Sequence, residues 1–191
     1  MKILLIIFDI LIIIVVVVLG SIFYKFSTGN DVNLINNNPE KNLQINIHDG
    51  TYKIGEESIT LKNGLEIRDI VPGSASKLIT KYWGNDLITD LDGNGTEDRA
   101  FIITQQTGGT GTFYYVTAML NTKNGQVTVP GILLGDRISP QNMNLEAGGI
   151  LDVNYVDRKP GESFVINPSL GKILRLRVDP KSLQFVVAAI K

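Results

Sequence analysis

The stretch DLDGNGTED at residues 90–98 has the residue types and the spacing of a cation-binding loop. Oxygen-bearing side chains stand at its first, third, fifth and ninth positions, and a glycine, Gly95, stands at the sixth, where such a loop turns sharply. Alternating oxygens of this kind wrap around one hard cation, which takes about six to eight of them. The sequence therefore predicts a Ca²⁺ site formed by Asp90, Asp92, Asn94, the backbone carbonyl of Thr96, and Asp98.

This loop departs from the helix-flanked calcium loop at its twelfth position. Phe101 stands where a bidentate Glu belongs, and strand patterns lie on both sides. The stretch is more similar to the D-x-D-x-D-G-x-x-D loops between strands of FG-GAP-type extracellular β repeats. The missing Glu predicts weak affinity, roughly 10⁻⁴–10⁻³ M, as in extracellular modules. A solvated acidic turn without metal is the alternative, because Asp, Asn and Gly favour turns on their own account.

Other residues with possible chemistry are less well organised in the sequence. A pair of carboxylates can hydrolyse glycosidic bonds. The carboxylates available for this are Asp136, Asp152, Asp157 and Glu162, but nothing in the sequence brings two of them to the required separation. Aromatic side chains offer either a carbohydrate or peptide surface or ordinary core: Tyr82, Trp83, Tyr114 and Tyr115. Asp–Arg neighbours recur at 98–99, 136–137 and 157–158, and alternation along a strand predicts that such neighbours do not face each other.

Composition excludes several classes of function. Lys and Arg number 18 against 19 Asp and Glu, so no nucleic-acid partner is expected. The absence of Cys excludes disulfides, thiol catalysis and zinc–thiolate sites. His48 is the single histidine, and its polar surroundings predict that it is exposed.

The sequence predicts that β-strands position these residues. Short runs rich in Val, Ile, Thr, Tyr and Phe alternate with Gly, Asn, Asp and Pro clusters, and no long amphipathic helix is visible. The expected strands are 51–54, 58–61, 65–70, 77–83, 86–89, 99–105, 112–120, 126–134, 142–147, 150–156, 163–166, 172–178 and 183–190. The predicted fold is mainly β, an antiparallel sandwich or open barrel, preceded by one N-terminal transmembrane helix.

The N-terminal segment is read as a membrane anchor. Residues 3–24 are almost uniformly apolar, and a helix of that length spans roughly 33 Å, enough for a bilayer core of about 30 Å. A cleaved signal is the alternative. Residues 1–24 are therefore assigned to the anchor, 25–50 to a flexible linker, and 51–191 to a β domain outside the cytoplasm. Asp9 interrupts the apolar run, either near the interface or as a contact to a partner helix.

Several strings resemble a set of small bacterial envelope domains that occur alone behind an anchor or beside META-type (HslJ-like) lipoprotein domains. The strings cover most of the chain from Thr51 to Glu162: LKNG, PGSASKLITKYWGN, DLDGNGTEDRAFIITQQTGGTGTFYYVTAMLN, LLGDRISPQ and VNYVDRKPGE. The chain differs from that family's pattern at Asn94, where Asp is usual, and at Ser163, where Pro is usual. The resemblance implies an envelope location and this fold, and it brings no reaction and no ligand.

These observations predict a single-pass membrane protein whose calcium-stabilised domain, periplasmic or at the cell surface, binds or scaffolds an envelope protein or a glycan. No catalytic residues are predicted. The alternatives are an envelope hydrolase with paired carboxylates and an accessory subunit of a membrane complex.

Overall fold

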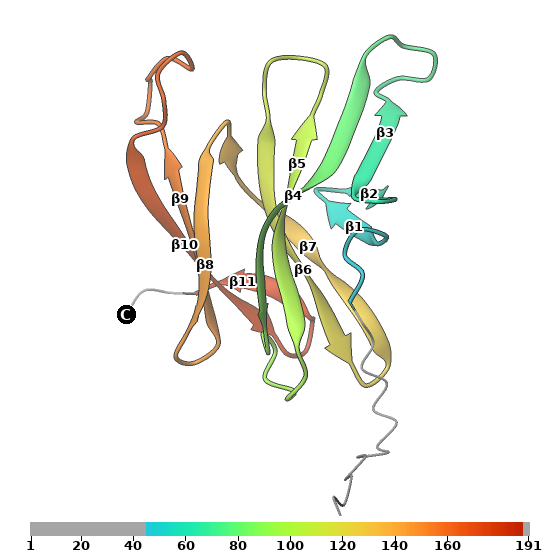
Figure 1. The fold of residues 1–191 in the computed structure, drawn as a ribbon, viewed down its shortest axis with the longest axis vertical. Helices are drawn as coiled ribbons and strands as arrows, with labels where there is room; N and C mark the ends of the chain where they lie inside the picture. Colours follow the sequence, from blue (N-terminus) through green and yellow to red (C-terminus); the bar gives the residue numbers. More distant parts are fainter. Residues whose placement is uncertain (1–44, 189–191) are drawn as a thin grey trace, which may run out of the picture. The chain divides into compact units, whose positions relative to one another are not determined.

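The computed structural model describes residues 45–188. The predicted anchor at 3–24 and most of the predicted linker lie outside the described residues. Within residues 45–188, no helix is long and apolar enough to cross a membrane. This part of the chain contains eleven strands in two sheets, which confirms the prediction of a mainly β fold (Figure 1).

The larger sheet has seven strands in the order β2-β1-β7-β6-β5-β4-β3. Its neighbours pair antiparallel, except that β1 meets β7 in parallel at Ile54 and Gly131. The strands are β1 (Thr51–Ile54), β2 (Glu57–Thr60), β3 (Leu65–Asp69), β4 (Lys77–Thr89), β5 (Asp98–Gln106), β6 (Phe113–Thr122) and β7 (Gly125–Asp136).

The smaller sheet has four antiparallel strands in the order β11-β10-β9-β8. They are β8 (Ser139–Glu146), β9 (Ile150–Asp157), β10 (Leu170–Asp179) and β11 (Gln184–Val187). β4 lies beside β8 and β7 lies beside β11, so the two sheets approach each other along both sides. The described residues thus form a mainly β domain whose sheets make a nearly closed, barrel-like arrangement.

Two hydrophobic cores lie on opposite faces of β5. Even-numbered residues such as Ala100 and Ile102 join the core between the two sheets, together with apolar side chains of the smaller sheet. Odd-numbered residues such as Phe101 and Ile103 join a second core formed with β1, β2 and the segment before them. Because β7 and β6 separate β1 from β5 in the sheet order, the larger sheet must curl to bring these residues together. Burial on both faces accounts for the continuous apolar run of β5.

The structure corrects three sequence predictions. The two strands expected at 77–83 and 86–89 are one long strand, β4, whose register shifts around Gly84. Residues 163–166, expected to form a strand, belong to the connection between β9 and β10. The segment 45–50, assigned to the linker, packs onto the domain, since Ile47 has no exposed surface and the ring of His48 lies 4.4 Å from that of Tyr82.

Candidate metal centre

The acidic loop connects the end of β4 to the start of β5. Asp90 follows β4 directly, and Asp98 is the first residue of β5. Leu91 anchors the loop, because its side chain is buried in the core between the sheets. Gly93 and Gly95 have φ angles of 79° and 86°, the left-handed region that glycine adopts without strain.

The structure brings three predicted ligands together. One carboxylate oxygen each from Asp90, Asp92 and Asp98 lies within 4.8 Å of the others. Oxygens bound to one Ca²⁺ at about 2.3–2.6 Å lie at most about 5 Å apart. The cluster therefore has the right dimensions to share one calcium ion.

Asp98 is the buried member of this cluster, with no exposed surface. Its Oδ2 accepts a 2.8 Å hydrogen bond from the backbone N–H of Leu91, and its Oδ1 accepts one of 2.8 Å from that of Asn121. Burial raises the pKa of its carboxyl from 3.8 to about 6; the charge of nearby Asp92 adds to the rise, and the backbone donors of Asn121, Leu91 and Asp92 oppose it. A cation beside Asp98 would supply the opposite charge that this buried carboxylate needs.

Asp90 shapes the backbone of the loop. Its Oδ1 accepts hydrogen bonds from the N–H groups of Gly93 and Asn94 at 2.8 and 3.1 Å, and its Oδ2 accepts one from Gly95 at 2.9 Å. Such bonds are typical of an Asp that starts a tight turn. They hold the loop in place without a metal, so the alternative of a plain acidic turn stays open on geometry alone.

The side chains of Asn94 and Thr96 bind each other beside the carboxylate cluster. The side-chain oxygen of Asn94 accepts hydrogen bonds from the backbone N–H and the hydroxyl of Thr96. Its side-chain nitrogen donates to Asp92 at 3.0 Å and to the carbonyl of Asn121 at 2.8 Å. Ligation by the Asn94 oxygen would require its amide group to turn over.

Asn121 is the residue that the sequence did not point to. It lies near the end of β6, and its backbone N–H and carbonyl bind Asp98, Asn94 and Thr96. Its side chain also donates a 2.7 Å hydrogen bond to the carbonyl of Glu97. The strand pair β5–β6 brings it there, and its residue type in the sequence gives no sign of this role.

The carboxylates considered for hydrolysis each have another partner. Asp136, Asp152 and Asp157 form ion pairs with Arg137, Arg175 and Lys172, respectively, and Glu162 accepts a hydrogen bond from the backbone of Lys159. Burial acts to raise the pKa values of Asp136 and Asp157, but the neighbouring cations and backbone donors lower both. A general acid for glycoside hydrolysis needs a raised pKa, so these two residues are poorly suited to that role.

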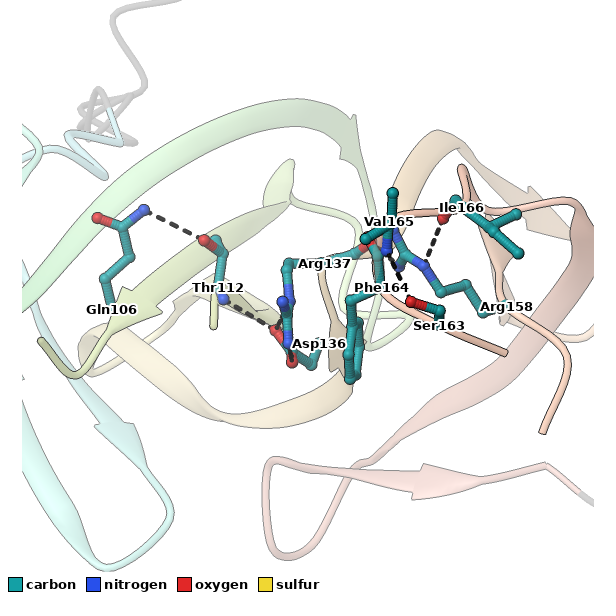
Figure 2. Close-up of polar contacts among 9 residues, drawn as sticks. All are labelled: Gln106, Thr112, Asp136, Arg137, Arg158, Ser163, Phe164, Val165 and Ile166. Carbon is teal, nitrogen blue, oxygen red and sulfur yellow. Dashed lines mark hydrogen bonds and ion pairs between the residues drawn. The ribbon is translucent and has the colours of Figure 1, made fainter. Parts of the chain in front are cut away.

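The pairing within Asp136–Arg137 corrects the expectation that such neighbours face apart. β7 ends at Asp136, and Arg137 adopts a φ of 49°, so strand alternation no longer applies. Its Nη2 lies 2.6 Å from the Asp136 carboxylate (Figure 2). Arg158 donates instead to three backbone carbonyls, those of Arg137, Phe164 and Ile166.

Comparisons of the chain with protein-family models, with curated proteins and with solved structures find no match.

Proposed function

We propose that this chain is a membrane-anchored envelope protein. Its β domain, displayed outside the cytoplasm, is stabilised by calcium and serves to bind or scaffold an envelope component without catalysing a reaction. The observation that carries the proposal is the convergence of Asp90, Asp92 and the buried Asp98 on one point. The apolar segment at 3–24 supports the membrane location.

Calcium in this loop would act on the fold of the domain. The cluster joins the end of β4 to the start of β5, and β5 carries both cores. A cation shared by the three carboxylates would offset their mutual repulsion and fix the point at which β5 begins. A weak site of this kind suits a compartment with calcium near the millimolar range.

Thermal unfolding of the compact unit Leu43–Lys191 in EGTA and in millimolar CaCl₂ tests the calcium site. With a Kd of roughly 10⁻⁴–10⁻³ M, CaCl₂ at about 10 mM is roughly 10–100 times the Kd and adds about 1.4–2.7 kcal/mol to the free energy of unfolding. We expect a rise in Tm with CaCl₂ that Asp92→Ala abolishes. MgCl₂ should give a smaller rise, because Mg²⁺ demands a stricter geometry.

Glu97→Ala is the matched control. Glu97 carries the same charge in the same loop but stands outside the carboxylate cluster. The control should keep the calcium-dependent rise. A loss equal to that of Asp92→Ala would show a diffuse charge effect, and no rise in the unmodified domain would make the loop a plain turn.

A further inference from the structure

Exposed apolar side chains gather in two connections at one end of the domain. The β9–β10 connection exposes Phe164, Val165 and Ile166 by 52%, 92% and 51%, and the β3–β4 connection exposes Ile70 and Val71 by 45% and 62%. Both connections leave the end of the domain at the top of Figure 1. The acidic loop between β4 and β5 lies at the opposite end of these strands.

The β9–β10 connection is held in a defined shape that keeps these side chains out. The guanidinium of Arg158 donates to the carbonyls of Ile166 and Arg137, both at 2.7 Å. The guanidinium of Arg137 lies 3.5 Å from the centre of the Phe164 ring. In Figure 2, Val165 points away from this stacked pair. Arg158 and Arg137 thus hold the connection against the domain, while its apolar tip faces solvent.

Charge distinguishes the two ends of the domain. Residues 157–172 carry three basic side chains, Arg158, Lys159 and Lys172, against two acidic ones, Asp157 and Glu162, and Lys172 is paired with Asp157. The acidic loop at 90–98 carries four acidic residues and one basic neighbour follows it at Arg99, which is paired with Asp86. An anionic surface would therefore repel the acidic end and accept the apolar end.

We propose that the apolar end docks on the surface of a lipid bilayer, with Val165 at the centre of the contact and Ile70 and Val71 as a second point. This inference rests on the proposed function, because the anchor at 3–24 keeps the bilayer within reach. Apolar side chains beside an exposed lysine suit the headgroup boundary, where the apolar groups enter the acyl region and Lys159 meets lipid phosphates. So small a contact is weak alone, and tethering raises the local concentration of the surface.

The chain outside the described residues is long enough for this docking. Residues 25–44 number twenty, and a chain of twenty residues can span at most about 70 Å. The longest strand, β4, has 13 residues, a length of about 43 Å. A chain of this length lets either end of the domain reach the bilayer. The exposed apolar and charged side chains at each end therefore determine which end docks.

A single-cysteine fluorescence experiment on the full chain tests the proposal, because the protein contains no Cys. Val165→Cys carries an environment-sensitive fluorophore, and the chain is reconstituted into vesicles of phosphatidylcholine with phosphatidylglycerol. We expect a blue shift of emission and strong quenching by a lipid-borne quencher. Lys123→Cys, in the exposed β6–β7 turn at the opposite end, is the matched control and should show neither effect.

A second variant separates docking from general proximity to the vesicle. Val71→Cys reports on the β3–β4 connection, and adding Val165→Asp should remove its blue shift, since a carboxylate in the contact is repelled by anionic lipid. Val165 is almost fully exposed, so this substitution should leave the Tm unchanged. If the blue shift at Val71→Cys is unchanged by Val165→Asp, the two connections do not dock on the bilayer together and the proposal is wrong.

The remaining outcomes are distinguishable. A chain that floats with the vesicles but shows no shift at position 165 keeps its anchor, and only the docking inference fails. A shift without lipid quenching indicates a second copy or another protein on this surface, which also overturns it. A chain that does not float with the vesicles lacks the anchor, and then the proposed function fails together with this inference.

Discussion

The backbone N–H of Asn121 donates a 2.8 Å hydrogen bond to Oδ1 of Asp98, a carboxylate with no exposed surface. Asn121 lies on β6 and Asp98 opens β5, so this bond joins two strands at the point where the acidic loop begins. The other oxygen of Asp98 accepts the N–H of Leu91. One side chain thus satisfies two backbone donors and also faces the carboxylates of the candidate metal centre.

Asp98→Ala should destabilise the domain even without calcium. The substitution leaves the N–H groups of Leu91 and Asn121 without their acceptor, and each unsatisfied buried group costs about 1–3 kcal/mol. Urea unfolding in EGTA at pH 5, where the folded domain keeps the Asp98 carboxyl protonated, should show a loss of at least about 2 kcal/mol. Asp92→Ala is the control and should cost far less in EGTA, because Asp92 is only partly buried. If the two variants lose the same free energy of unfolding, Asp98 acts mainly through its charge and not through its hydrogen bonds to Leu91 and Asn121.

The stability of the calcium-free domain should depend on the protonation of Asp98. Its pKa is about 6 in the folded domain and 3.8 ordinarily, so the folded state binds the proton more tightly than the unfolded chain does. The stabilisation from this group is therefore complete below pH 3.8 and is lost as pH rises through about 6. In EGTA, unfolding free energies between pH 5 and pH 7.5 should fall more steeply with pH for the unmodified domain than for Asp98→Asn. Parallel pH profiles for the two proteins would contradict the raised pKa.

The sequence predicted the strands better than the ways in which they combine. The alternation and turn residues located most strands, because local periodicity follows from which face is buried. The register shifts that let β4 pass through Gly84 and Asn85 depend on left-handed φ angles of 116° and 59°. The pattern YWGND therefore looked like a break, although the strand continues. The run SFVI at 163–166 has the composition of a strand, but it lies in neither sheet, and the carbonyl of Ile166 accepts a hydrogen bond from Arg158.

At the candidate metal centre, too, part of the arrangement could be predicted from the sequence and part could not. Spacing alone identified the three carboxylates that converge, because a short loop restricts the positions that its side chains can adopt. The side-chain orientations of Asn94 and Thr96 could not be predicted, since they depend on the carbonyl of Asn121. That carbonyl is 25 residues or more away in sequence and arrives through the register of β5 and β6.

Substitutions on β5 test the presence of two separate cores. Phe101→Ala removes a fully buried ring from the core formed with β1 and β2, and Ile102→Ala removes a fully buried side chain from the core between the sheets. We expect losses of about 3–5 and 2–5 kcal/mol in urea unfolding, respectively. Ile88→Ala, at a position that is 54% exposed on β4, should change stability by less than about 1 kcal/mol. A small loss for Phe101→Ala would show that the second core is not closed.

Arg158→Lys tests the fastening of the β9–β10 connection. Lysine keeps the charge but lacks the planar fork that reaches the carbonyls of Arg137, Phe164 and Ile166. Limited chymotrypsin digestion should cut after Phe164 several times faster in this variant, because the freed segment enters the protease more readily. The global unfolding free energy should fall by only about 1–2 kcal/mol, since these carbonyls become accessible to water when the bonds are lost.

Lys159→Ala is the matched control for this measurement. Lys159 is exposed, and the hydrogen bond of this residue to Glu162 comes from its backbone N–H, which the substitution keeps. Its cleavage rate should equal that of the unmodified protein. If Arg158→Lys also digests at the unmodified rate, the guanidinium bonds do not hold the connection. The exposure of Val165 would then follow from the packing of Phe164 on Arg137, and Phe164→Leu becomes the variant that should release the segment.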